Sequence, residues 1–155
     1  MLARAASALL ILAAATAPLS ATADEAVVLR VKPTKACTAK AATPADLGEV
    51  AYAPDAFAGR CVSLQGYWRD VAVYPTRAEA AQPDALSIPF LDRRRVGLYA
   101  SAKDEARAPA APAAVHVVGV VGSCATLLAG GADVTGYCHD KAGAYLAVSG
   151  ISLDK

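Results

Sequence analysis

The feature that most constrains the fold is a glycine inside each of four apolar segments of the chain. A glycine within a strand often marks a bulge or a sharp bend. In the first segment Val62 and Leu64 alternate with polar neighbours, as in a half-buried strand. If that alternation continues, Trp68 is a core residue, which is the favoured interpretation. If Gly66 forms a bulge, Tyr67 turns inward and Trp68 is exposed. The pattern predicts strands at residues 60–70, 94–100, 115–121 and 145–153.

A further strand completes a hairpin with the first segment. Residues 71–74 (VAVY) follow a predicted turn at Arg69-Asp70, and Pro75 ends them. Valine is abundant among the large apolar residues of the chain, and valine favours strands over helices. The chain is therefore predicted to be mostly β.

A short helix is predicted ahead of the first strand. Thr43 can cap its start, Pro44 suits the first helical position, and Asp46 can reach back as in a capping box. Leu47 and Val50 then give the helix a small apolar face. A proline soon afterwards keeps the helix short.

Three other parts of the chain are predicted to lie outside these elements. Residues 24–42 form a leading arm, ahead of a single domain at 43–155. Residues 76–92 are interpreted as a surface insertion. Residues 101–114 are polar and then rich in proline and alanine, which excludes a long helix there.

The N-terminus carries the features of a secretory signal peptide. Arg4 precedes an apolar run, and small residues at 21–23 form a cleavage site before an acidic pair. The apolar run has about 15 residues, whereas a membrane-spanning helix needs about 20. We therefore expect residues 1–23 to be cleaved, which leaves no transmembrane segment and a periplasmic or secreted protein.

The charge balance argues against nucleic acid as a partner. The chain has 15 basic and 14 acidic side chains, for a net charge of +1. Cleavage after residue 23 removes one basic residue, Arg4, and brings the net charge to zero. Affinity for nucleic acid depends largely on an excess of lysine and arginine at the phosphate backbone, so we expect no nucleic-acid partner.

Export would place four cysteines in an oxidising space, namely Cys37, Cys61, Cys124 and Cys138. An even number of cysteines in a small exported domain indicates disulfides first. Three pairings are possible. The pairing of Cys37 with Cys61 and of Cys124 with Cys138 is favoured, because each pair is close in sequence and flanks a loop-rich stretch. Closing the second loop contributes about 3 kcal/mol of stability.

A metal site and a hydrolytic site are the alternatives for the C-terminal loop. Cys124, Cys138, His139 and Asp140 offer sulfur, nitrogen and oxygen ligands. Cys138 and His139 are adjacent, however, and the chain has no Cys-x-x-Cys pair, so a compact tetrahedral site is hard to build. Asp140 can orient the His139 imidazole, but no nucleophile accompanies the pair in the sequence. No metal, cofactor or catalytic residue is therefore predicted.

The order of the predicted elements resembles that of an OB-fold, a five-stranded Greek-key barrel. Residues 57–66 (FAGRCVSLQG) are similar to the start of small exported bacterial OB-like domains, and residues 115–121 (VHVVGVV) to their fourth strand. The Gly-Tyr-Cys-His motif at 136–139 is similar to one that precedes the last strand in a group of uncharacterised exported bacterial proteins. The resemblance implies a five-stranded OB-fold-like Greek-key barrel with a short N-terminal helix. A small β-sandwich is the alternative.

In OB-folds, strands 2 and 3 and the loops joining strands 1–2 and 4–5 form the usual ligand face. The candidate ligand-binding residues are therefore Arg69, Tyr74, Arg95, Tyr99 and His139. An exposed groove of aromatic and arginine side chains there would identify a binding module. The arginine run at 93–95 is interpreted as a solvated edge that discourages strand pairing, with an anion-binding patch as the alternative.

These features favour a non-catalytic exported module that binds a protein, an envelope glycan or a small ligand through its OB-like face. A purely structural or accessory domain is the first alternative. An enzyme or metal protein that uses His139 and Asp140 is the second. Fold alone does not fix function, and the sequence names no particular partner.

Overall fold

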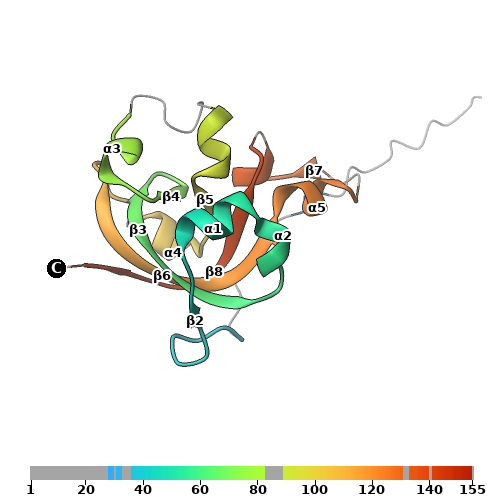
Figure 1. The fold of residues 1–155 in the computed structure, drawn as a ribbon, viewed down its shortest axis with the longest axis horizontal. Coiled ribbons are helices and arrows are strands. Elements are labelled where there is room, and N and C mark those ends of the chain that lie inside the picture. Colours follow the sequence, from blue (N-terminus) through green and yellow to red (C-terminus); the bar gives the residue numbers. More distant parts are fainter. Residues whose placement is uncertain are drawn as a thin grey trace, which may run out of the picture.

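The computed structural model shows a closed barrel of five strands (Figure 1). In chain order they are β3 (Cys61–Arg69), β4 (Ala72–Tyr74), β5 (Val96–Tyr99), β6 (Ala113–Ser123) and β8 (Ala144–Leu153). Around the barrel the order is β3-β4-β5-β8-β6, and β6 closes it by pairing with β3. Neighbouring strands are antiparallel, except that β5 and β8 are parallel. The predicted class, a mostly β, OB-fold-like barrel, is confirmed.

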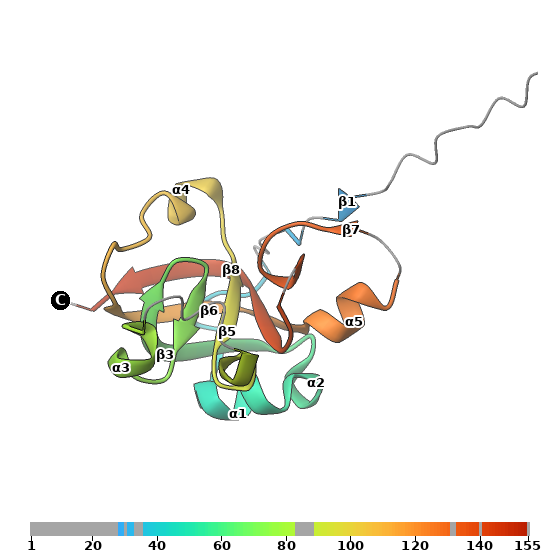
Figure 2. The same cartoon turned by 90° about the horizontal axis from the view of Figure 1, so that it is seen from above.

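The structure describes residues 28–29, 31–32, 36–82, 89–130, 133–139 and 141–154. The predicted signal peptide at 1–23 and the predicted role of Asp140 lie outside these residues. The predicted leading arm is described in part. There β1 (Val28–Leu29) pairs in parallel with β7 (Asp133–Val134), so the arm runs beside the loop that precedes β8 (Figure 2).

The hairpin between β3 and β4 turns one residue later than predicted. Arg69 pairs with Ala72, so Asp70 and Val71 form the turn. Asp70 adopts a φ of 52°, a left-handed conformation that aspartate tolerates better than most residues. Its main-chain oxygen accepts a 2.8 Å hydrogen bond from Nε1 of Trp68. Asp70 thus takes the left-handed position that a glycine usually occupies in such a turn.

The barrel interior holds an apolar cluster to which every barrel strand except β4 contributes two or more side chains. On β3, Val62, Leu64 and Trp68 point inward in one phase, and Trp68 is only 2% exposed. Gly66 causes no slip, because the register between β3 and β6 is regular through it. The irregularity lies instead in the pairing of β6 with β8, at residues 118–119. The core assignment of Trp68 is confirmed.

Two short helices, α1 (Leu47–Tyr52) and α2 (Pro54–Phe57), precede the barrel. Val50 is 0% exposed, and Leu47 and Ala51 are buried beside it in the interior cluster, so α1 closes one side of the barrel. Figure 2 shows α4 (Ala102–Glu105) on the opposite side. The predicted apolar face of the first helix is confirmed.

The predicted start of that helix is wrong by three residues. Thr43 and Pro44 form β2, a short strand that pairs in parallel with β3. The next residue, Ala45, donates its N–H to the Ser63 oxygen at 3.0 Å, so sheet pairing replaces capping here. Asp46 is the N-cap, and its Oδ1 accepts the Glu49 N–H at 2.9 Å.

Two long connections wrap the outside of the barrel. The first, between β4 and β5, contains α3 (Arg77–Ala80) and η2 (Pro89–Arg93). The second, between β6 and β8, contains α5 (Cys124–Leu128), β7 and η3 (Tyr137–His139). Together with the outer sides of β4 and β5 they bury a second cluster, which we call the outer cluster. Its buried members are Ala72, Tyr74, Ala80, Leu91, Tyr99, Cys124, Val134, Tyr137 and Cys138.

The first connection is therefore more than the predicted surface insertion at 76–92. Ala80 and Leu91 are both 0% exposed and pack in the outer cluster. The Thr76 side chain caps α3 by accepting the Glu79 N–H. The sequence pattern did not predict these two buried residues, because they lie among polar residues and alanines. One apolar residue per turn is enough to pack so short a segment against the barrel.

Both favoured disulfides are present, and the prediction is confirmed. Cys37 pairs with Cys61 and Cys124 pairs with Cys138, with Cα atoms 5.3 Å apart in each pair. Disulfides of this kind fit an oxidising compartment. Within the described ranges, no helix combines the length and the apolar character needed to cross a bilayer.

Candidate functional site

The usual ligand surface of an OB-fold corresponds here to the outer side of β4 and β5. Side chains alternate along these strands, so that Val73 and Leu98 point into the barrel while Tyr74 and Tyr99 point outward. Two of the predicted ligand-binding residues therefore lie on the expected face. Both are nevertheless buried, with Tyr74 at 1% and Tyr99 at 5% exposure.

Tyr137, from the connection before β8, covers this face. A Cβ placed on Gly97 of β5 would lie 2.1 Å from a carbon of the Tyr137 ring, so only glycine allows this approach. Cys138, the residue after Tyr137 in η3, forms a disulfide with Cys124 at the start of α5. The chain's own connection thus occupies the place that a ligand would take on this face.

Arg95 lies against Tyr137 of the outer cluster and is 0% exposed. Its Nε donates a 3.0 Å hydrogen bond to the Tyr137 hydroxyl, and its Nη2 forms an ion pair with the Asp92 carboxylate. The guanidinium carbon also lies 5.8 Å from the centroid of the Tyr137 ring. A buried charge persists only with partners of this kind. For Arg95 the predicted solvated edge is wrong, since this side chain joins η2 to η3.

Burial raises the pKa of Tyr74, Tyr99 and Tyr137 in this cluster and of Tyr145 beside it. The pKa of Tyr137 rises to about 12, although the positive charge of Arg95 opposes the rise. The Tyr99 hydroxyl accepts the Cys138 N–H at 3.0 Å. The Tyr74 hydroxyl forms no hydrogen bond of good geometry with any described residue, although the nearby positive charge of Arg95 opposes the rise in its pKa. These phenols stay neutral at physiological pH, which suits a structural role.

Arg69 also binds one of the two connections that cover this face, namely the connection between β4 and β5. Its Nη1 donates to the main-chain oxygen of Ala80, the last residue of α3, at 2.9 Å and to that of Gln82 at 3.3 Å. Its Nε lies 3.6 Å from a carboxylate oxygen of Asp70. Arg69, Tyr74, Arg95 and Tyr99 thus gather around one face, as predicted, but the exposed groove expected there is absent from the described residues.

His139 is exposed at the end of η3, where its Nδ1 lies 3.0 Å from the Val134 oxygen. Because Cys124 and Cys138 form a disulfide, neither presents the free thiolate that a metal site would need. The described residues contain no group of three or more His, Cys, Asp and Glu side chains placed to hold a metal ion. Asp140, the predicted partner of His139, is outside those residues.

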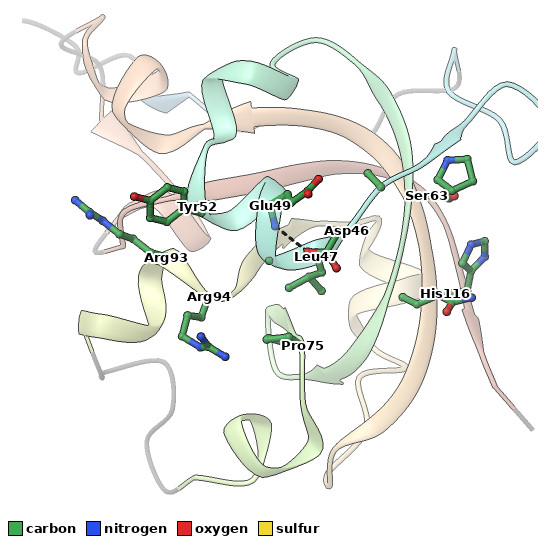
Figure 3. Close-up of a pocket in the computed structure, with 13 residues that line it drawn as sticks. Asp46, Leu47, Glu49, Tyr52, Ser63, Pro75, Arg93, Arg94 and His116 are labelled. Carbon is green, nitrogen blue, oxygen red and sulfur yellow. Dashed lines mark hydrogen bonds between the residues drawn. The ribbon is translucent and has the colours of Figure 1, made fainter.

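An open groove of about 980 Å³ runs along α1 (Figure 3). Its lining comes from β2, α1, β3, β6, the residue after β4 and the arginines that follow Asp92. The residues that matter most below are Asp46, Glu49, Tyr52, Gln65, Arg93 and Arg94. Their side chains combine both charges, an amide and an aromatic ring. We call this surface the α1 groove.

The α1 groove contains two arginines of the 93–95 run, while the third, Arg95, is buried against Tyr137. Arg94 forms an ion pair with Glu79, and its side chain is 52% exposed. Arg93 is exposed, and Tyr52 is 72% exposed. The predicted alternative of an anion-binding patch therefore applies at most to Arg93 and Arg94. Sequence reasoning missed Tyr52 and Glu49, because their position depends on how α1 docks on the barrel.

A second hollow of about 490 Å³ adjoins the α1 groove, since His116 lines both. It lies beside the disulfide of Cys37 and is bordered by the last residues of β8. There the Ser149 hydroxyl donates to the Val118 oxygen at 3.1 Å, so part of its polar rim is already satisfied. The hollow extends the groove across the outer face of β6.

Comparison of the chain with protein-family models, with curated proteins and with solved structures found no match. The fold and the two surfaces described above therefore define only a class, a disulfide-bonded, OB-fold-like barrel whose usual ligand face is covered from within.

Proposed function

We propose that the protein is a non-catalytic exported binding module, which contacts a protein, an envelope glycan or a small ligand through the α1 groove. One observation carries the proposal. The face that OB-folds usually offer to ligands is filled by Tyr137 and Arg95, whereas the α1 groove is open. The proposed binding surface therefore lies along α1 and β3 and not on the outer side of β4 and β5.

The composition of the groove supports binding. Exposed aromatic and arginine side chains are the residues most enriched at binding hot spots, and Tyr52 and Arg93 supply them here. Phe90, one turn from Arg93 on η2, is a further exposed aromatic at 64% exposure. The volume of the groove lies within the range of pockets that hold small ligands, and its open form suits larger partners as well.

Export is the second element of the proposal. It is supported by the predicted signal peptide at 1–23 and by the two disulfides, which fit an oxidising compartment. Intact-mass measurement of the protein from its own cells tests it. We expect a chain that begins at Asp24 and carries no free thiol, and a full-length chain would contradict export.

Photo-crosslinking tests the α1 groove. A photoreactive residue replaces Tyr52 in one variant and Ala102 of α4, on the opposite side of the molecule, in another (Figure 2). We expect a specific product from position 52 only. The substitution Arg93→Glu should reduce that product at least about fivefold, equivalent to about 1 kcal/mol of binding, whereas Lys103→Glu should not.

A purely structural or accessory role is the second candidate, and the covered face favours it. A domain that fills its own ligand face with Tyr137 has lost the surface on which OB-folds usually act. Equal and unspecific crosslinking from positions 52 and 102 would support this role and exclude the binding module.

A further inference from the structure

One edge of β3 has a gap in its strand pairing where it borders the α1 groove. On this edge β2 pairs with Val62 and Ser63, and β4 pairs from Tyr67 onward. None of the described strands pairs with residues 64–66 on that side, although β6 pairs continuously along the other edge. Gln65 lines the groove at this point. The groove therefore lies against an open stretch of sheet edge.

Hydrogen bonds on either side show which residue of the gap faces the groove. The Ser63 oxygen accepts the Ala45 N–H at 3.0 Å on the groove side, whereas the Arg60 oxygen accepts the Val121 N–H at 3.1 Å on the β6 side. Main-chain groups of successive residues alternate between the two edges of a strand. Gln65, two residues after Ser63, therefore directs its N–H and its C=O toward the groove.

The charges along the groove differ from side to side. Figure 3 places Arg93 and Arg94 on one side and Asp46 toward the other. Arg94 already pairs with Glu79, so Arg93 is the arginine better placed to meet a negative charge on a ligand. The groove thus suits an elongated ligand with a negative group near Arg93 and a positive group near Asp46.

We propose that the α1 groove binds an extended polypeptide segment of a partner protein, one residue of which hydrogen-bonds through its main-chain N–H and C=O to the main chain of Gln65. This inference rests on the proposed function, because it names the ligand class of the same groove. The main chain of each non-proline residue carries one donor and one acceptor, which complements the C=O and the N–H of Gln65. Addition of an extended segment to an open sheet edge is a general mode of peptide recognition.

The free protein offers the first test. With both disulfides intact, NMR-detected hydrogen exchange should find the Gln65 amide exchanging at least about tenfold faster than the amides of Leu64 and Gly66, because unpaired amides open to solvent more readily. Leu64 and Gly66 direct their amides to β6 and serve as internal controls. Equal protection of the three amides would show that this edge of β3 is not open, and it would overturn the proposal.

Peptide selection offers the second test. The probe is a phage-displayed pool of random linear heptapeptides, selected on the immobilised protein. We expect enrichment of sequences with an acidic residue toward one end and a basic residue toward the other. Binding of an enriched peptide should fall at least about tenfold with Arg93→Glu and stay unchanged with Lys103→Glu. Methylation of a single peptide nitrogen in the ligand should cause a similar loss, because it removes a main-chain donor.

The two experiments separate this inference from the function on which it rests. If crosslinking at position 52 succeeds but the peptide pool gives no enrichment dependent on Arg93, the groove binds another class of ligand and the peptide proposal is wrong. If neither experiment gives a product that depends on Arg93, the binding function fails as well.

Discussion

Arginine and tyrosine side chains are buried on the covered face of β4 and β5 but exposed in the α1 groove. Each surface contains arginine and tyrosine, and the single run at 93–95 contributes arginines to both. On the covered face Arg95 is 0% exposed and is held by Asp92 and Tyr137. In the groove Arg93 and Tyr52 point to solvent.

The difference shows how a barrel can change its available surface without changing its strands. Two connections, each docked by a few buried side chains, convert the usual ligand face into a second core. That second core differs from the barrel interior, because it contains phenols, a disulfide and a buried ion pair. Polar groups in such a core need partners, so its stability depends on individual contacts more than on area buried.

The largest expected effect separates two arginines that are two residues apart. Arg95→Met should lower the free energy of unfolding by about 3–5 kcal/mol, because it leaves the Asp92 carboxylate without its buried partner. Arg93→Met, at the groove, should change it by less than about 0.5 kcal/mol, as is usual for exposed positions. Urea denaturation of both variants provides the measurement.

A double variant tests whether the loss comes from the unpaired Asp92 charge or only from poorer packing. Arg95→Met combined with Asp92→Leu should recover part of the stability, since replacing a buried ion pair with apolar residues is often tolerated. Similar stabilities for Arg93→Met and Arg95→Met would show that the covered face is open in solution, and the contrast between the two surfaces would then fail.

The next effect concerns the Cys124–Cys138 disulfide, which lies within the connection that covers β4 and β5. Replacing Cys124 and Cys138 with alanine should destabilise the protein by about 3 kcal/mol, the value expected for a loop of this length. Limited proteolysis should then cleave the connection before β8 first. The matched variant without Cys37 and Cys61 should lose a similar amount of stability and keep that connection resistant. Equal cleavage patterns would contradict a local role for the Cys124–Cys138 bond.

Much of the barrel could be predicted from the sequence, because alternation along a strand is a local signal. The inward phase of Val62, Leu64 and Trp68 and the disulfide pairing both followed from neighbouring residues. The turn and the helix start were displaced by one to three residues, since Asp70 and the pairing of Thr43 with β3 depend on contacts between segments.

The exposure of the candidate site could not be predicted in the same way. Tyr74 and Tyr99 were placed correctly on the outer side of the barrel, but their burial depends on Tyr137, almost forty residues beyond Tyr99. Gly97 gave the one available signal, since a glycine in a strand can mark a close approach. The sequence does not say which side chain makes that approach.

Alkaline pH should weaken the covered face and leave the groove unaffected. An unfolded tyrosine titrates near 10.0, whereas burial raises the pKa of Tyr137 to about 12. Between these values the unfolded chain releases a proton that the folded chain keeps, so the free energy of unfolding falls as the pH rises. The contribution is complete below about pH 10, and its loss amounts to about 2–3 kcal/mol by about pH 12.

Urea denaturation between about pH 8 and pH 12 measures this loss. Tyr74, Tyr99 and Tyr145 add to it in the same direction, because burial raises the pKa of each. Tyr137→Phe should make the decline shallower, while Tyr52→Phe in the groove should not. An identical pH dependence in the two variants would contradict the burial of Tyr137.

The smallest effect distinguishes two phenols within the covered face itself. The Tyr137 hydroxyl accepts a hydrogen bond from Arg95, so Tyr137→Phe should cost about 1.5–3 kcal/mol at neutral pH. The Tyr74 hydroxyl is buried and has no hydrogen-bond partner among the described residues. Tyr74→Phe should therefore leave the free energy of unfolding within about 0.5 kcal/mol or raise it, since no bond is lost and a polar group no longer needs to be desolvated. A clear loss with Tyr74→Phe would mean that this hydroxyl has a partner in solution, either the neighbouring Arg95 guanidinium or a bound water between β4 and the cover. A bound water there would make the outer cluster wetter than the barrel interior, and its connections easier to displace from the ligand face beneath them.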